Sequence, residues 1–85
     1  MLDRATLTSR VIEVVRRTMP GQPASADLSE QTDLYDAGLT SMAMVKLMLA
    51  IEVEFDISIP DVDLLPDNFR SIGAIEALVE RLRQP

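Results

Sequence analysis

Residues 36–55 read DAGLTSMAMVKLMLAIEVEF, a polar turn followed by an apolar segment of helical length. A glycine in the turn and a serine at the start of the segment are typical of a turn that leads into a helix. We expect this helix to run from Ser41 to Asp56, with its apolar side chains on two opposite faces. One face is a core stripe, in which Phe55 is expected to be the largest core side chain of the protein. The stripe consists of Met44, Leu47, Met48, Ile51 and Phe55.

The opposite face of this helix is also apolar, although a surface helix of a small domain normally carries charges there. Two interpretations stay open. Either the long loop before the helix covers this face, or the face docks a partner. The neighbouring hydroxyl of Ser41 favours a partner. The predicted partner-binding residues are Met42, Val45, Lys46, Leu49 and Val53, with Glu52 at the edge of the face.

The composition indicates one small domain over residues 1–85 and disfavours a self-sufficient hydrolase or metalloenzyme. Hydrophobic residues make up 47% of the 85, which is enough for an aliphatic core. The chain has neither cysteine nor histidine. This excludes disulfides, a thiolate nucleophile, the usual general base and the commonest zinc ligand. No apolar run reaches membrane-spanning length and no secretory signal is recognised, so a cytoplasmic location is the default.

The net charge of −6 is concentrated in the middle of the chain. Residues 27–67 contain ten acidic residues against a single base, Lys46. Such a field repels nucleic acid and attracts basic protein surfaces, although solubility alone is an alternative explanation. The aspartates of this region, Asp61, Asp63 and Asp67, lack the spacing of a calcium loop of the EF-hand type. We therefore expect no metal site.

Two further helices are predicted, one on each side of this region. The first spans Asp3 to Thr18, with Asp3 as N-cap, and ends before residues 20–23, which contain two prolines and a glycine. The last begins after Ser71, which is a good N-cap. The apolar stripes of the two helices are Leu7, Val11, Val14 and Val15 in the first and Ile72, Ile75, Leu78, Val79 and Leu82 in the last.

The segments between the helices are predicted to be irregular. Residues 57–60 are expected to form an extended connector, and a short helical turn is expected between Leu64 and Phe69. The long loop that ends at Thr40 carries four side chains that we expect to anchor it to the core. The prediction is therefore an all-α protein, a small four-helix bundle of three main helices and one short helix. The four anchors of the loop are Leu28, Leu34, Tyr35 and Leu39.

Three segments of the sequence resemble the acyl carrier protein family. Residues 34–42, LYDAGLTSM, resemble its phosphopantetheine attachment motif. Residues 52–61, EVEFDISIPD, resemble the end of its second helix, and residues 71–82 resemble its last helix. The interval between the first two motifs fits without a gap, and the resemblance covers nearly the whole chain. The resemblance implies a four-helix bundle of the acyl-carrier type.

The resemblance also implies a cofactor. Ser41 would receive 4′-phosphopantetheine from coenzyme A through a separate phosphopantetheinyl transferase. The arm would supply the thiol that the chain lacks, and a monomeric carrier would hold an acyl or aminoacyl group there as a thioester. Asp36, Gly38 and Thr40 would flank the arm, and Gly38 would permit the turn with a positive φ. A phosphodiester at a helix N-terminus is favoured by free amides and by the helix dipole.

The departures from the family pattern bear on the cargo. Thr40 and Met42 stand where the family often has aspartate and leucine. Ala43, Lys46 and Val53 stand where fatty-acid carriers are often acidic. The mostly apolar face is more similar to stand-alone carriers of amino acids, including those loaded by synthetase-like ligases and the D-alanyl carriers of cell-wall modification. We therefore expect an amino acid cargo. The partners would be a loading ligase and a downstream acceptor enzyme, with no nucleic acid and no membrane.

Two alternatives remain at this stage. One is a carrier of fatty or polyketide acyl chains. The other is an unmodified helical interaction domain that uses the apolar face as a helix-docking or dimer surface.

Overall fold

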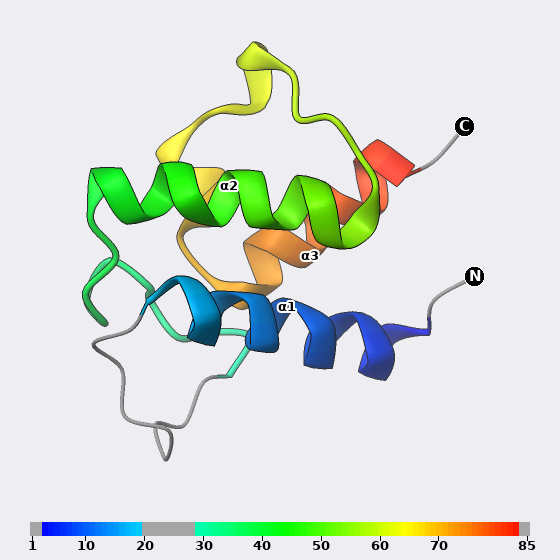
Figure 1. The fold of residues 1–85 in the computed structure, drawn as a ribbon. Helices are drawn as coiled ribbons and strands as arrows, with labels where there is room; N and C mark the ends of the chain where they lie inside the picture. The colour runs from blue at the N-terminus through cyan, green and yellow to red at the C-terminus, as the bar shows by residue number, and fades with distance from the viewer. Residues whose placement is uncertain (1–2, 20–28, 84–85) are drawn as a thin grey trace.

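The computed structural model describes residues 3–19 and 29–83. In these ranges it has three α-helices and two 3₁₀ turns, and no strand. Figure 1 shows α1 and α2 side by side and running in opposite directions, with α3 packed behind them. This confirms the predicted all-α fold with three main helices. The elements are α1 (Arg4–Thr18), α2 (Ser41–Phe55), η1 (Asp61–Asp63), η2 (Pro66–Phe69) and α3 (Ile72–Arg83).

Helix α1 forms as predicted. The carboxylate of Asp3 accepts a hydrogen bond of 2.7 Å from the amide of Thr6 and so caps the helix. The predicted apolar stripe is the buried one. The proline-rich helix stop at residues 20–23 and the predicted anchor Leu28 lie outside the described residues.

Helix α3 also begins where the sequence predicts, because the hydroxyl of Ser71 accepts a hydrogen bond of 3.1 Å from the amide of Ala74. A close contact with the main chain explains why a glycine, Gly73, stands in the first turn of this helix. Its amide donates to the carbonyl of Glu30 over 3.0 Å, and a Cβ at this position would lie 3.2 Å from that oxygen. The glycine therefore lets the loop before α2 lie directly against α3.

The loop before α2 is anchored by the predicted side chains that the structure describes. Leu34 and Leu39 are buried, and the amide of Leu34 donates to the carbonyl of Arg70 over 2.7 Å. Tyr35 is half-buried, and its hydroxyl donates to the carbonyl of Pro66 over 2.8 Å. The start of α2 is thus held against η2 and the segment that follows it.

The region between α2 and α3 differs from the prediction in three details. Helix α2 ends one residue early, because Asp56 adopts a left-handed backbone (φ 53°) and caps the helix. The helical turn predicted between Leu64 and Phe69 is present as η2, and η1 is an additional 3₁₀ turn that was not predicted. The largest fully buried side chain is Phe69 rather than Phe55, which keeps 6% of its surface exposed at the edge of the core.

Candidate functional site

Ser41 is exposed as the first residue of α2. The helix is capped by the residue before it, because the Thr40 hydroxyl accepts from the amide of Ala43 over 3.1 Å. The carbonyl of Thr40 accepts from the amide of Met44 over 2.8 Å. The cap therefore does not depend on the hydroxyl of Ser41. The amides of Ser41 and Met42 have no acceptor inside the helix, so the helix start presents donors beside an exposed hydroxyl.

The turn before Ser41 is built by a glycine and an aspartate. Gly38 has φ 113°, which confirms the predicted positive φ and is a conformation that other residues rarely adopt. The carboxylate of Asp33 accepts from the amide of Tyr35 over 2.9 Å and from the amide of Asp36 over 3.2 Å. These local bonds fix the turn that delivers Ser41 to the surface.

Arg70 contacts this turn and stabilises it. The sequence analysis did not predict this role of Arg70. Its guanidinium lies 3.4 Å from the carboxylate of Asp33 and 3.2 Å from that of Asp67. It also lies 5.4 Å from the centre of the Tyr35 ring. Burial raises the pKa of the Tyr35 phenol, which therefore remains a neutral donor to η2. The ion pair between Asp67 and Arg70 could have been predicted from the sequence, because the two residues are three positions apart.

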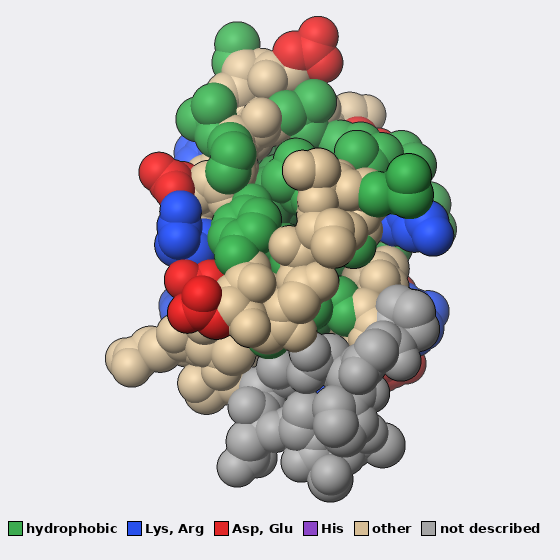
Figure 2. All heavy atoms as spheres, turned by 90° about the vertical axis from the view of Figure 1, so that its left-hand side faces the viewer, with side chains coloured by type: hydrophobic (Ala, Val, Ile, Leu, Met, Phe, Trp, Pro, Cys, Tyr) green, Lys and Arg blue, Asp and Glu red, His purple; other side chains and the backbone are tan. Residues whose placement is uncertain are grey.

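The apolar residues predicted to bind a partner form an exposed surface, which we call the outer face of α2. The described part of the loop, residues 29–40, does not cover it. Figure 2 shows hydrophobic side chains gathered on the side of the molecule where α2 begins. The exposed fractions are 74% for Met42, 48% for Val45, 51% for Leu49 and 84% for Val53, and Lys46 is also exposed.

Glu52, the sixth predicted partner-binding residue, has a different environment. It is half-buried, and its carboxylate accepts a hydrogen bond of 2.7 Å from the amide of Ile59. This bond ties the connector after α2 back onto the helix. The carboxylate therefore faces the connector, and the only charge on the outer face of α2 is that of Lys46.

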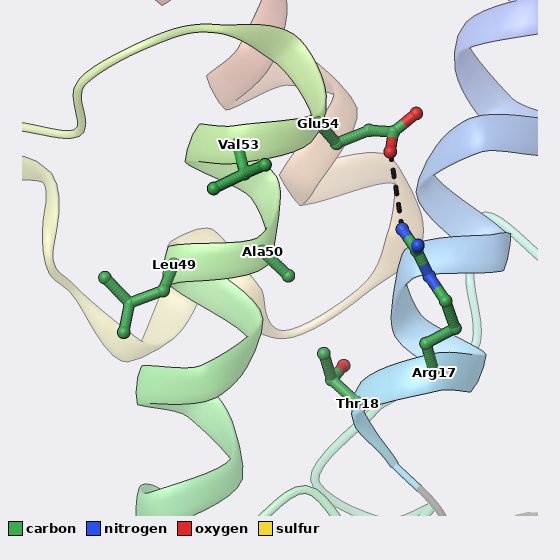
Figure 3. Close-up of a pocket in the computed structure, with 6 residues that line it drawn as sticks. All are labelled: Arg17, Thr18, Leu49, Ala50, Val53 and Glu54. Carbon is green, nitrogen blue, oxygen red and sulfur yellow. Dashed lines mark hydrogen bonds and ion pairs between the residues drawn. The ribbon is translucent and has the colours of Figure 1, made fainter.

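A groove of about 420 Å³ lies between the end of α1 and α2, and the sequence analysis did not predict it (Figure 3). At one end the carboxylate of Glu54 accepts from Arg17 over 3.3 Å and from Arg10 over 2.9 Å. The hydrogen bond from Arg10 is the main reason that the pKa of Glu54 lies below its usual value. Arg17, Thr18, Leu49, Ala50, Val53 and Glu54 line the groove.

Two other kinds of site find no support in residues 3–19 and 29–83. These residues contain no group of three or more acidic, histidine or cysteine side chains that could hold a metal ion. Two of the acids between α2 and α3 pair with arginines, since Asp63 lies 2.6 Å from Arg81 and Asp67 lies 3.2 Å from Arg70. None of the helices described here combines the length and the apolar character needed to cross a membrane.

Residues 9–79 match the protein family described as "Phosphopantetheine attachment site". The match spans the turn, Ser41, the outer face of α2 and most of α3. The chain therefore belongs to this family of phosphopantetheine-binding carrier proteins, and its cofactor is 4′-phosphopantetheine.

Two curated relatives are carriers of the same family from Bradyrhizobium diazoefficiens. Aminoacyl carrier protein 2 is 44% identical over 71 residues, covering 84% of this chain and 80% of that protein. Aminoacyl carrier protein 1 is 42% identical over 77 residues, covering 91% of this chain and 86% of that protein. The resemblance to the acyl carrier protein family is thus confirmed. Both relatives support a stand-alone aminoacyl carrier protein.

A solved structure of similar fold confirms the acyl-carrier type of bundle. It is the crystal structure of an engineered Bradyrhizobium japonicum glycine:[carrier protein] ligase complexed with a carrier protein from Agrobacterium tumefaciens and AMP. The matched chain is 39% identical, with a TM-score of 0.78, and the match covers 86% of this chain and 97% of that chain.

Proposed function

We propose that Ser41 is the attachment serine for 4′-phosphopantetheine. The observation that carries this proposal is an exposed hydroxyl on the first residue of α2 that the helix cap does not use. The free amides of Ser41 and Met42, together with the helix dipole, suit an anionic phosphodiester at this point.

The neighbouring residues would hold this hydroxyl in place. Thr40 fixes the first turn of α2, and Gly38 allows the backbone to reverse direction before it. Asp36 is exposed in the same turn and is available to a transferase. When bound, the cofactor supplies the thiol on which a cargo is held. Carriers of this kind do no catalysis, so the chain presents its cargo to other enzymes at high effective concentration.

We propose that the cargo is an amino acid, loaded by a synthetase-like ligase that docks on the outer face of α2. The relatives are named aminoacyl carrier proteins, and the matched carrier chain is bound to a glycine:[carrier protein] ligase. The outer face of α2 carries only the charge of Lys46. Enzymes that recognise an acidic helix, which is the kind of helix expected in fatty-acid carriers, would therefore bind it poorly. We propose further that the chain acts as a monomeric single domain and passes its cargo to a downstream acceptor enzyme.

Transfer of the arm tests the attachment site. The unmodified protein is incubated with coenzyme A and a broad phosphopantetheinyl transferase, and its intact mass is measured. We expect the wild type to gain one phosphopantetheine and Ser41→Ala to gain none. Ser58→Ala removes another exposed serine and should be modified like the wild type. An unchanged mass of the wild-type protein would refute the proposal.

A loading assay tests the cargo. The modified protein is incubated with ATP, an aminoacyl ligase of the glycine:[carrier protein] type and a panel of amino acids. A parallel reaction contains an acyl ligase and fatty acids. We expect a hydroxylamine-sensitive mass increase with an amino acid. Loading by fatty acids alone would favour the acyl carrier alternative instead.

A further inference from the structure

We infer that the groove between the end of α1 and α2 binds the thiol end of the unloaded phosphopantetheine arm. This inference rests on the proposed attachment of the arm at Ser41. The groove is open to solvent beside the outer face of α2, and two of the exposed residues of that face, Leu49 and Val53, form one of its walls (Figure 3).

The attachment serine and the groove are joined by a single row of side chains. Ser41, Val45, Leu49 and Val53 follow one another at intervals of four residues. Residues at this spacing are neighbours on a helix and form a continuous ridge that turns slowly around the axis. The row is exposed along its whole length and ends in the groove. An arm that lies along the row is therefore directed into the groove.

The length of the arm matches this path. From Ser41 to Val53 the helix rises by about 18 Å, and from Ser41 to Leu49 by about 12 Å. From the serine oxygen to the sulfur, the arm has as many bonds as roughly five residues of extended chain, which span about 17 Å. The sulfur therefore reaches the groove at Leu49 with slack, whereas the rise to Val53 is slightly longer than the extended arm. The sulfur thus lies in the part of the groove next to Leu49.

The chemistry of the groove suits a neutral thiol and its methylene groups. Leu49, Ala50 and Val53 contribute only carbon. The hydroxyl of Thr18 donates to the carbonyl of Val14 over 3.0 Å, and Figure 3 shows its methyl group on the side of α2. The ion pair between Arg17 and Glu54 borders the apolar part. Burying the apolar end of the arm here removes carbon surface from water, which favours the docked state.

Docking of the arm and docking of a ligase would exclude one another. Leu49 and Val53 belong both to the groove and to the outer face of α2. A ligase that covers this face would displace the arm from the groove and free the sulfur for its own active site. The groove would thus hold the sulfur only while no partner is bound.

The test measures the reactivity of the arm's thiol, which is the only thiol of the modified protein because the chain has no cysteine. The alkylation rate with iodoacetamide is compared with that of free phosphopantetheine. We expect the protein-bound thiol to react at least about twofold more slowly, because the docked fraction is protected. Val53→Gln should restore the rate of the free compound. Val62→Gln, at another highly exposed valine, in η1 and outside the row, should leave the slow rate unchanged.

A second readout locates the arm directly. Amide NMR spectra of the unmodified and modified protein are compared, and we expect shifts at Thr18 and Val53 in addition to those next to Ser41. The inference is overturned if the protein-bound thiol and free phosphopantetheine react at equal rates and Thr18 does not shift. It is also overturned if the slow rate of the protein-bound thiol persists in Val53→Gln. Absence of the mass gain overturns the attachment proposal instead, and the groove proposal with it.

Discussion

Arg10 of α1 donates from Nη2 to the main-chain carbonyl of Glu54 over 2.6 Å, while its Nε donates to the carboxylate of the same residue over 2.9 Å. The guanidinium also lies 4.7 Å from the centre of the Phe55 ring. A basic group at the carboxyl end of a helix satisfies a terminal carbonyl and opposes the helix dipole. This contact joins the last turn of α2 to α1, at the end of α2 that lies farthest from Ser41.

Glu54→Gln should lower the free energy of unfolding at neutral pH by about 0.5–1 kcal/mol, the range for a partly exposed ion pair. The pKa of Glu54 is lowered in the folded state, first by its hydrogen bond from Arg10. Its contribution is therefore fully present above the ordinary pKa of a glutamate in the unfolded chain. It is lost as the pH falls through the lower folded pKa. Urea unfolding of both proteins across acidic pH measures this difference. Glu13→Gln, at an exposed acid of α1, is the control for the loss of one surface charge.

Thr40→Ala and Ser41→Ala should have opposite effects on stability and modification. Thr40 caps α2, so its loss should cost about 1 kcal/mol and leave the attachment serine in place. Ser41→Ala should leave the unfolding free energy nearly unchanged and abolish modification. Thermal unfolding and intact mass measure the two properties on the same samples. A destabilised Ser41→Ala protein would show that this serine has a structural role.

Gly38→Ala should destabilise the protein by about 1–2 kcal/mol, because an L-residue is strained at positive φ. It should also slow modification, since the turn that presents Ser41 would shift. Urea unfolding and the initial rate of phosphopantetheine transfer check both effects. Asp36→Ala lies in the same turn without a positive φ and should not reduce the stability in the same way.

Phe69→Ala should remove about 3–5 kcal/mol of stability, as is usual for a fully buried aromatic side chain. This is a large part of the roughly 5–15 kcal/mol that holds a domain of this kind folded. Phe69→Leu keeps most of the volume and should remain folded. Circular dichroism during thermal unfolding distinguishes the two variants, and a stable Phe69→Ala protein would contradict the burial of this ring.

Leu49→Asp should weaken transfer from the loading ligase with little effect on the fold, because half of the Leu49 surface is exposed. The charge would interrupt the apolar outer face of α2, where a partner is proposed to dock. The loading rate and the melting temperature measure the two effects. A large fall in melting temperature would assign Leu49 to the core instead.

The helices could be predicted from the sequence because their signals are local. The apolar stripes of α1 and α3, with Asp3 and Ser71 as N-caps, follow from residues within a few positions of one another. The two apolar faces of α2 followed from the same periodicity. Thr40 and Ser41 are adjacent residues that can both cap a helix, and only the structure assigns the cap to Thr40.

The features that sequence analysis missed depend on contacts between distant residues. Phe69 lies in a short segment without periodicity, so nothing local marks it as buried. Glu76 is fully buried in α3, where the Thr8 hydroxyl donates to its carboxylate and the Nε of Arg4 lies 3.3 Å from its second oxygen. Both partners are on α1, far away in the sequence. The groove likewise needs the end of α1 beside α2, and no pattern within one helix predicts it.

Tyr35 is the single tyrosine of a chain that has no tryptophan. Its hydroxyl bonds to η2, and its ring lies in the segment that leads to Ser41. Ultraviolet emission from this protein therefore comes from one phenol, at the junction between that segment and η2. A partner without tryptophan or tyrosine that pulls the two apart would change this emission, so its binding could be followed in real time without attaching a dye.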